Sequence, residues 1–393
     1  MIRMAIIAWP CIHYGGAERW WYYVLREFRR DTEISYYVVI PFSLHRGCLK
    51  CPKVLSPNTI IIYLPPKRNQ LLDLFSWFRI LIKLIKERNI DLIIAGYQTP
   101  RIVLVSLLTG VITKRRVFVM LHSPIGWLPY VRETKLNVAS KIMIKLYGLL
   151  NRHGLSYFIL CSPSVVYDLE RMHLKATKVC SVKGSAVIKP IEVTYRPYNV
   201  RDREIDIVYL ASISMAKGIY DVPLILRKVK ERIPNFKAVI IGRISDDLEK
   251  RSFRETLKSY GVENNVTLLG YVDEIKKFEL LARSKVMIYP SYMDTFAIVV
   301  LEALFVGTPV VAYGVPAIRI NYRTNAVIPV RIGDVNEVAE KAIKILGDEQ
   351  YWAGLSIEAI AYASTYSWNI IARDFLKCIA KGLKGYEDLV YRS

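Results

Sequence analysis

Cysteine is scarce in this sequence, and its spacing excludes most cysteine-based sites. Only Cys48 and Cys51 among the 6 cysteines form a Cys-x-x-Cys pair. A structural zinc site needs about four ligands, and His45 alone lies close to this pair. We therefore expect free thiols, with a local Cys48–Cys51 disulfide or a zinc site as the alternatives.

Long apolar runs are also missing, which argues against a membrane-spanning helix. The apolar stretch Ile102–Thr113 falls far short of the roughly 20 residues that a bilayer requires. The stretch Met4–Trp9 is too short for a signal peptide, and no small-residue cleavage site follows it. We therefore expect a cytoplasmic protein.

Glutamine is nearly absent, with 3 residues, whereas Lys, Arg, Ile and Tyr are plentiful. This bias resembles that of proteins from thermophiles, in which an intracellular disulfide is less surprising. With 52% hydrophobic and 23% charged residues, the whole chain has a globular composition. Its length of 393 residues favours two domains, because one hydrophobic core seldom organises so long a chain.

Acidic residues are rare in the first half of the chain. Residues 1–200 carry 29 basic and 11 acidic side chains, a net charge of +18, whereas residues 201–393 carry 27 and 24, a net charge of +3. A basic half attracts nucleic acid, anionic lipid or an anionic small molecule. No nucleic-acid-binding module is recognisable, so charge alone supports that first alternative.

Two basic amphipathic segments, Leu71–Arg88 and Lys141–Arg152, lie in this half. In the first, six apolar residues follow a helical stripe with four cations mostly off it. Such a helix binds an anionic membrane surface peripherally, or it packs on its own sheet with its charges in solvent. The stripe is Leu71, Leu74, Phe75, Phe78, Ile82 and Ile85, and the cations are Arg79, Lys83, Lys86 and Arg88.

Short strands rich in Ile, Val and Tyr alternate with amphipathic helical segments along the whole chain. This alternation predicts parallel sheets with right-handed crossovers, the doubly wound α/β fold. The pattern lapses over residues 186–203, which we take as a linker between an N-terminal domain (1–185) and a C-terminal domain (204–365). We expect residues 366–393 to form a C-terminal crossover helix. Ligands of such folds bind at the carboxyl ends of the strands.

Several candidate functional residues follow predicted strands. Gly15 and Gly16 come after the first strand and open a helix, which suits a diphosphate or a plain turn. Lys217 follows the first strand of the second domain and is placed to meet phosphate charge. His122 ends an apolar strand, where a histidine is as often a satisfied turn residue as a ligand.

The segment Pro290–Pro309 is the most specific of these. It places Asp294 in a loop and Glu302 eight residues later, about two turns into a helix. A carboxylate accepts hydrogen bonds from sugar hydroxyls. Glu302 stands within the apolar run VVLEALFV, so its carboxylate requires a partner rather than solvent.

Together these segments resemble glycosyltransferase family four, the retaining enzymes with two Rossmann-like domains facing across a cleft (the GT-B fold). The likeness covers most of the chain. Tyr289–Ala312 resembles the family's donor-site signature, and Lys217-Gly218 resembles its diphosphate lysine and glycine. Further matches are Gly15-Gly16-Ala17-Glu18, His122, Ser162, Leu269-Gly270-Tyr271 and Ser367-Trp368, where the family's last helix starts back to the first domain.

The resemblance implies a transferase that moves a hexose, such as mannose or glucose, from a UDP- or GDP-type donor without a metal or other cofactor. It implies Lys217 at the diphosphate, Glu302 at the ribose, and Asp294 at the hexose with His122. The acceptor is a lipid-linked or other glycan. The donor-binding residues implied are Gly15, Gly16, Lys217, Arg243, Tyr271, Thr295, Phe296, Ala297, Ile298 and Glu302.

Two residues depart from the family's pattern. Asp294 stands where the family has Glu, and Ser212 stands where an arginine accompanies the diphosphate lysine. Loss of a cation beside a leaving diphosphate weakens stabilisation of the transition state, unless Arg243 replaces it. The alternative function is therefore a weakened relative that binds sugar nucleotide or anionic membrane without turnover.

Overall fold

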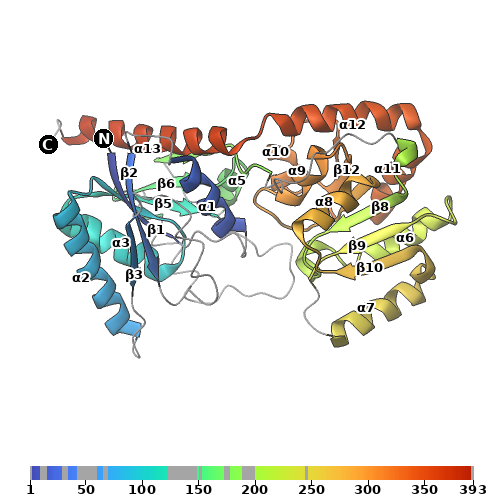
Figure 1. Cartoon of the computed structure of the whole chain (residues 1–393), viewed down its shortest axis with the longest axis horizontal. Coiled ribbons are helices and arrows are strands. Elements are labelled where there is room, and N and C mark those ends of the chain that lie inside the picture. The colour runs from blue at the N-terminus through green and yellow to red at the C-terminus, as the bar shows by residue number, and fades with distance from the viewer. Residues whose placement is uncertain are drawn as a thin grey trace. The chain divides into compact units, whose positions relative to one another are not determined.

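The chain folds into two α/β units in a computed structural model (Figure 1). Of the described residues, those before 186 and those of the last helix form one unit, and those from 186 to 367 form the other. The structure describes residues 2–8, 16–28, 34–41, 60–64, 70–122, 148–149, 153–171, 178–187, 200–243 and 247–390.

The first unit is built on a parallel sheet of seven strands in the order β3-β2-β1-β4-β5-β6-β7. The order reverses between β1 and β4, which makes the carboxyl ends of these two strands the switch point of the sheet. The strands are β1 (Ile2–Ile7), β2 (Ile34–Pro41), β3 (Ile60–Leu64), β4 (Leu92–Ala95), β5 (Arg116–Leu121), β6 (Ser156–Leu160) and β7 (Val179–Ser181).

Five helices belong to this unit within the described ranges. They are α1 (Gly16–Phe28), α2 (Gln70–Arg88), α3 (Pro100–Thr113), α5 (Val165–Arg171) and α13 (Trp368–Val390). α2 packs against β3 and α3. The packing alternative for the helix 71–88 is therefore confirmed, but its predicted stripe is wrong in part. The buried residues include Trp77, Leu81, Leu84 and Ile85, whereas Phe75 is 60% exposed.

The second unit repeats the same topology with six parallel strands in the order β10-β9-β8-β11-β12-β13. Its switch point lies between β8 and β11. The strands are β8 (Ile205–Leu210), β9 (Ala238–Ile241), β10 (Val266–Gly270), β11 (Ser284–Tyr289), β12 (Val310–Tyr313) and β13 (Val327–Val330).

Helices of the second unit follow its strands. They are η4 (Met215–Lys217), α6 (Val222–Lys230), α7 (Asp247–Ser259), α8 (Glu274–Ala282), α9 (Ile298–Phe305), α10 (Pro316–Asn321), α11 (Val335–Gly347) and α12 (Glu349–Ser364), with short 3-10 turns at η3 (Val200–Asp202) and η5 (Glu263–Asn265). No helix of the described part is long and apolar enough to cross a bilayer.

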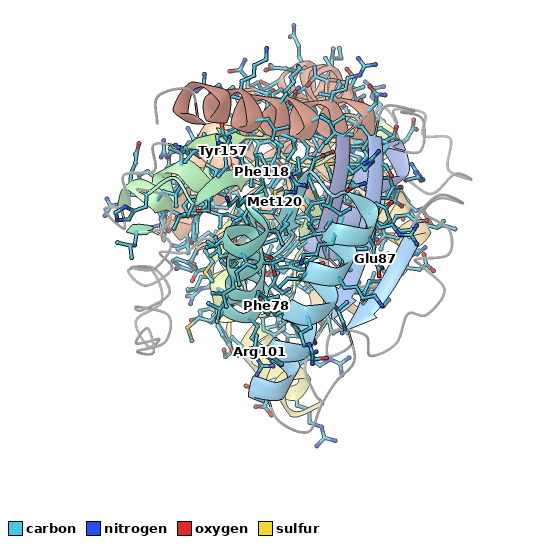
Figure 2. The ribbon with its side chains drawn as sticks, turned by 90° about the vertical axis from the view of Figure 1, so that its left-hand side faces the viewer. Phe78, Glu87, Arg101, Phe118, Met120 and Tyr157 are labelled. Atoms are coloured by element: carbon cyan, nitrogen blue, oxygen red, sulfur yellow. A yellow bond between two sulfur atoms is a disulfide. The ribbon has the colours of Figure 1, made fainter. Side chains whose placement is uncertain are left out.

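The chain returns to the first unit through α13, as the sequence predicts for the helix from Ser367-Trp368. α13 packs on α1, β6 and β7. Its backbone comes so near the sheet that a Cβ at Gly382 would lie 2.4 Å from Cε1 of Phe118. Figure 2 shows Phe118 and Tyr157 beneath this helix. Burial of the aromatic face of α13 stabilises its docking.

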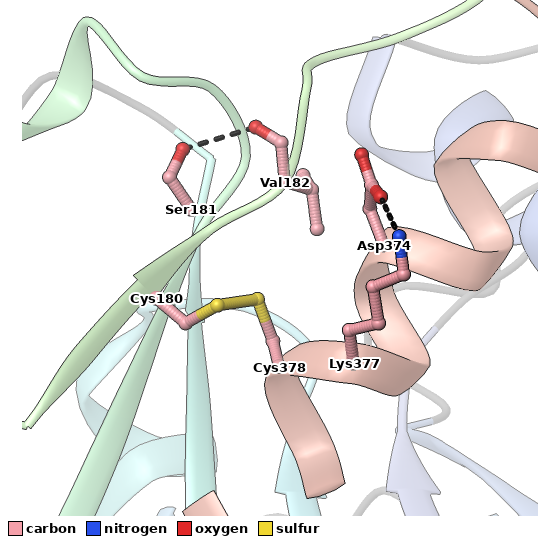
Figure 3. Close-up of a disulfide and its surroundings, with 6 residues drawn as sticks. All are labelled: Cys180, Ser181, Val182, Asp374, Lys377 and Cys378. Carbon is pink, nitrogen blue, oxygen red and sulfur yellow. Dashed lines mark hydrogen bonds and ion pairs between the residues drawn. A yellow bond between two sulfur atoms is a disulfide. The ribbon is translucent and has the colours of Figure 1, made fainter. Parts of the chain in front are cut away.

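A disulfide between Cys180 of β7 and Cys378 of α13 adds a covalent link to this packing (Figure 3). The expectation of free thiols is therefore wrong for these two cysteines. They are 198 residues apart, so no local pattern pairs them. Cys161 is a buried thiol outside this disulfide. Cys48 and Cys51, like the segment 141–147, lie outside the described residues.

Candidate functional site

Lys217 and Asp294 meet at the switch point of the second unit. Lys217 ends η4, in the loop after β8, and Asp294 lies in the loop after β11. The Lys217 ammonium is 2.6 Å from Oδ2 of Asp294 and also donates to the carbonyl oxygen of Met293 at 3.0 Å. Both side chains are partly buried, so this ion pair is screened less than a surface pair.

Gly218 allows the two loops to approach each other. Its φ of +69° lies in the left-handed region, and a Cβ there would be 1.8 Å from the carbonyl oxygen of Pro290. Any larger residue would push the β8 loop away from the β11 loop. This glycine therefore fixes the position of Lys217 relative to Asp294.

Tyr289 completes the contact from the end of β11. Its hydroxyl donates to Oδ2 of Asp294 at 2.6 Å and accepts from the Lys217 ammonium at 3.3 Å. Burial, with the charge of Asp294 beside it, raises the pKa of the Tyr289 phenol well above its usual value. Tyr289 therefore stays protonated and donates to the carboxylate. The sequence predicted no role for this residue.

Asp294 also orders the loop that leads into α9. Its Oδ1 accepts backbone N–H groups of Thr295 at 2.8 Å, Phe296 at 3.2 Å and Ala297 at 2.8 Å. Burial alone would raise the pKa of Asp294, but Lys217, Tyr289 and the N–H groups outweigh it and lower the pKa. The carboxylate is therefore ionised at neutral pH.

Ala297 is held in a backbone conformation that is costly for alanine. Its φ of 59° is left-handed. Its N–H donates to Asp294, and its carbonyl oxygen accepts from the hydroxyl of Tyr322 at 2.8 Å. These two bonds maintain the conformation. Local strain of this kind is common at ligand sites, and Ile298 begins α9 directly after it.

Glu302 lies about one turn into α9, rather than the two turns that the sequence suggested, because α9 begins only at Ile298. The side chain is 2% exposed. Its Oε1 accepts from the Lys277 ammonium at 2.6 Å, and Lys277 also pairs with Glu274 at 2.9 Å. The predicted need for a partner is confirmed. Lys277 lies on α8, and sequence alone gave no signal for it.

Arg243 lies beside the serine that replaces the expected arginine. The N–H of Ile213, next to Ser212, donates to the carbonyl oxygen of Arg243 at 3.2 Å. The Arg243 guanidinium lies over the ring of Tyr271 at 5.7 Å, and both side chains are exposed. The predicted residues Ser212, Arg243 and Tyr271 therefore share one edge of the sheet.

His122 follows β5 in the first unit, within an aromatic cluster. Its ring centroid is 5.6 Å from Trp20, 6.3 Å from Trp21 and 5.9 Å from Tyr97. Burial lowers the pKa of His122 to about 3, against a smaller opposing effect of its hydrogen bond to the backbone of Gly96. The imidazole is therefore neutral at physiological pH.

The remaining predicted residues of the first unit are Gly15 and Gly16. Gly16 begins α1, whereas Gly15 lies outside the described residues. In the part of the chain that the structure describes, no three His, Cys, Asp or Glu side chains gather into a metal-binding group. Whether transfer proceeds without a metal stays a prediction.

Comparison with known proteins finds a family match in the second unit. Residues 192–361 match the family described as Glycosyl transferases group 1. A phosphatidyl-myo-inositol mannosyltransferase of Mycolicibacterium smegmatis is 28% identical over 163 residues, 41% of each protein. The chain spans well under half of the length of the curated relatives it matches.

Solved glycosyltransferase structures share the fold of both units. Sucrose-phosphate synthase from Thermosynechococcus elongatus has a TM-score of 0.74 at 18% identity, with 100% of both chains covered. Anabaena HepE, in a complex with UDP and glucose, has a TM-score of 0.68 at 16% identity, with 97% of this chain and 99% of that chain covered. The predicted GT-B fold is thus confirmed. The segment that matches Glycosyl transferases group 1 contains Lys217, Asp294 and Glu302.

Proposed function

We propose that this protein is a retaining glycosyltransferase that moves a hexose from a nucleoside diphosphate donor to a glycan or lipid-linked acceptor. The observation that carries the proposal is the Lys217–Asp294 pair at the switch point of the group 1 segment. A lysine at this position supplies positive charge for a diphosphate. The start of α9 offers backbone N–H groups beside it.

In the proposed reaction the protein supplies position and charge. The bond between the anomeric carbon and the diphosphate breaks, and the diphosphate leaves with the electron pair. The oxygen of the acceptor hydroxyl bonds to that carbon, and the hydroxyl proton passes to the departing diphosphate. Lys217 stabilises the leaving charge. Asp294 and Tyr289 hold the ammonium in place, since three acceptors surround it.

The donor contacts follow from the family resemblance and from the site's geometry. Glu302 accepts from ribose hydroxyls, with Lys277 fixing the carboxylate. Asp294 has its Oδ1 on three backbone N–H groups and its Oδ2 on Lys217 and Tyr289. We therefore propose that Asp294 acts on the hexose mainly by shaping the loop 295–297. Metal independence and the roles of His122 and Gly16 remain proposals from the resemblance.

The alternative function is donor or membrane binding without turnover, and Ser212 is the residue that favours it. The position of Arg243 beside Ile213 supports a replacement of the missing cation. Under the transferase proposal, Arg243→Ala lowers kcat at least about tenfold, because a charge-assisted contact to the diphosphate is lost. Ser212→Arg raises kcat in the wild type, or restores the kcat that Arg243→Ala loses.

Two measurements distinguish these functions. Thermal unfolding with UDP, GDP and their hexose derivatives identifies the donor, since a bound ligand stabilises the folded state in proportion to its affinity. Donor turnover, measured with the same sugar nucleotides, then separates transferase from binder. Stabilisation without turnover for any donor and acceptor, in wild type and in Ser212→Arg, would contradict the transferase proposal.

A further inference from the structure

α3 presents an apolar row to solvent, which packing inside the first unit does not explain. Leu104 is 40% exposed, Leu108 48%, Val111 60% and Ile112 60%. These residues recur at helical spacing, so they occupy one side of the helix. The rest of the helix surface contains Ile102, Val103, Val105 and Leu107, which are buried. The exposed row is therefore additional to the core-facing side.

α2 lies beside α3 and extends this surface. In Figure 2 the two helices lie side by side on the viewer's side of the unit, with Glu87 near the end of α2 and Arg101 at the start of α3. On α2, Phe75 is 60% exposed, and the Arg79 guanidinium lies 5.7 Å from its ring centroid. We call the exposed residues of α2 and α3 the α2–α3 face.

The charge of the α2–α3 face is strongly positive. Residues 70–88 and 100–115 contain seven basic side chains and two acidic ones, Asp73 and Glu87. Lys83 pairs with Glu87 at 3.7 Å. Arg79, Lys83 and Lys86 line, with Ile82 and Glu87, a shallow hollow of about 400 Å³. The exposed cations of the face are Arg79, Lys83, Lys86 and Arg88, and the exposed Lys114 and Arg115 directly follow α3.

Cations at the ends of α2 and α3 have a local explanation, because positive charge is favourable at a helix C-terminus. That explanation does not extend to Arg79 and Lys83, which lie within α2, nor to the apolar row of α3. Apolar side chains rimmed by cations match the chemistry of an anionic bilayer, in which acyl chains lie beneath phosphate headgroups.

We infer that the α2–α3 face binds the surface of an anionic lipid bilayer. Leu104, Leu108, Val111 and Ile112 enter the headgroup region, and the surrounding cations contact lipid phosphates. The inference rests on the proposed function, since it names the surface that brings the transferase to a lipid-linked acceptor. It nevertheless concerns residues outside the donor site.

Sedimentation of the full chain with lipid vesicles tests this surface in the absence of any sugar nucleotide. We expect binding to vesicles of phosphatidylcholine mixed with phosphatidylglycerol, and much weaker binding to phosphatidylcholine alone. The double variant Leu108→Gln/Ile112→Gln lowers the vesicle partition coefficient about tenfold. Ile275→Gln/Ile357→Gln, at exposed positions of the second unit, is the matched control and binds as wild type.

A second pair of variants tests the charges. Lys83→Gln/Lys86→Gln lowers the partition coefficient about tenfold or more, and Lys228→Gln/Lys258→Gln, which changes two exposed lysines of the second unit, leaves it unchanged. Equal binding by face and control variants, or by both kinds of vesicle, would overturn the inference. So would a dimer that dissociates in Leu108→Gln/Ile112→Gln, because the face would then join two copies.

A failure of this inference can be distinguished from a failure of the proposed function. Lys217→Ala should lose donor turnover and keep vesicle binding, whereas Leu108→Gln/Ile112→Gln should keep turnover with a soluble acceptor and lose vesicle binding. Loss of both properties in one variant, with unchanged thermal unfolding, would contradict the separation of the two sites.

Discussion

Lys217 and Asp294 form an ion pair of 2.6 Å although 77 residues separate them in the sequence. Both follow strands that are neighbours in the sheet at the switch point, and Tyr289 contacts both side chains. The ion pair therefore connects Lys217, which we propose binds the diphosphate, to the loop that precedes α9.

Removal of the Lys217 ammonium should affect the chemical step. We expect Lys217→Ala to lower kcat at least about a hundredfold, because stabilisation of the leaving diphosphate is lost. Tyr289→Phe, which keeps the ammonium but removes one of its acceptors, should lower kcat about tenfold. Steady-state donor turnover measures both. Tyr292→Phe is the control, since that hydroxyl donates to Asp221 instead. An unchanged kcat in Lys217→Ala would refute the assigned role.

The buried pair between α8 and α9 should contribute strongly to stability. Lys277→Gln leaves the Glu302 carboxylate without its ammonium, and we expect the free energy of unfolding to fall by about 3 kcal/mol. Lys276→Gln breaks only an exposed pair with Glu279 on the same helix and should cost less than about 1 kcal/mol. Urea denaturation compares the variants. Equal losses of unfolding free energy in the two variants would show that burial of Glu302 does not raise the cost of removing its partner.

The disulfide should stabilise the first unit. Cys378→Ser should lower the free energy of unfolding by about 2–5 kcal/mol, because the unfolded chain regains the freedom of a long loop. Reductant should lower the free energy of unfolding of the wild type by a similar amount. It should not change that of Cys378→Ser, which already lacks this bond. Urea titrations with and without reductant give both values. Alkylation of Cys180 and Cys378 in the unfolded, unreduced protein would contradict the bond.

His122 should make the protein less stable in acid. Its pKa is about 3 in the folded state and near 6.5 when unfolded, so the unfolded state binds more protons between these values. Stability therefore falls as pH drops from about 6.5 to 3, with this residue contributing up to about 1.4 kcal/mol per pH unit. His122→Gln should show a shallower slope than wild type or the control His153→Gln, which changes an exposed histidine. Urea titrations across this pH range test it, and identical slopes would exclude a buried neutral His122.

Most central strands follow directly from the sequence, because runs such as Leu92–Ala95 are short, apolar and β-branched. Of the edge strands, β3 and β10 were also predicted, whereas β7 and β13 were missed. β7 has three residues, and β13 contains Pro329, which is tolerated at a sheet edge but obscures the strand pattern. α3 was also missed, since apolar residues on both of its sides hide the helical period.

At the candidate site, residues that follow strands were easier to predict than their partners. Lys217 and Asp294 could be placed together because strand ends of a parallel sheet meet at one edge. Tyr289 and Lys277 could not, because their contacts depend on how side chains pack after the elements assemble. The bond between Cys180 and Cys378 could not be predicted for the same reason, since only the return of α13 brings the two sulfurs together.

The return of α13 also orders events during synthesis on the ribosome. Trp20, Trp21 and Phe28 of α1 each lie within 6.1 Å, between ring centroids, of Phe375 on α13. These rings emerge from the exit tunnel early, but their partner emerges only after residues 186–367 have been translated. The nascent chain therefore exposes the aromatic rings of α1 without their partner Phe375 while residues 186–367 fold. Chaperones that shield such surfaces have their longest opportunity to bind in that interval.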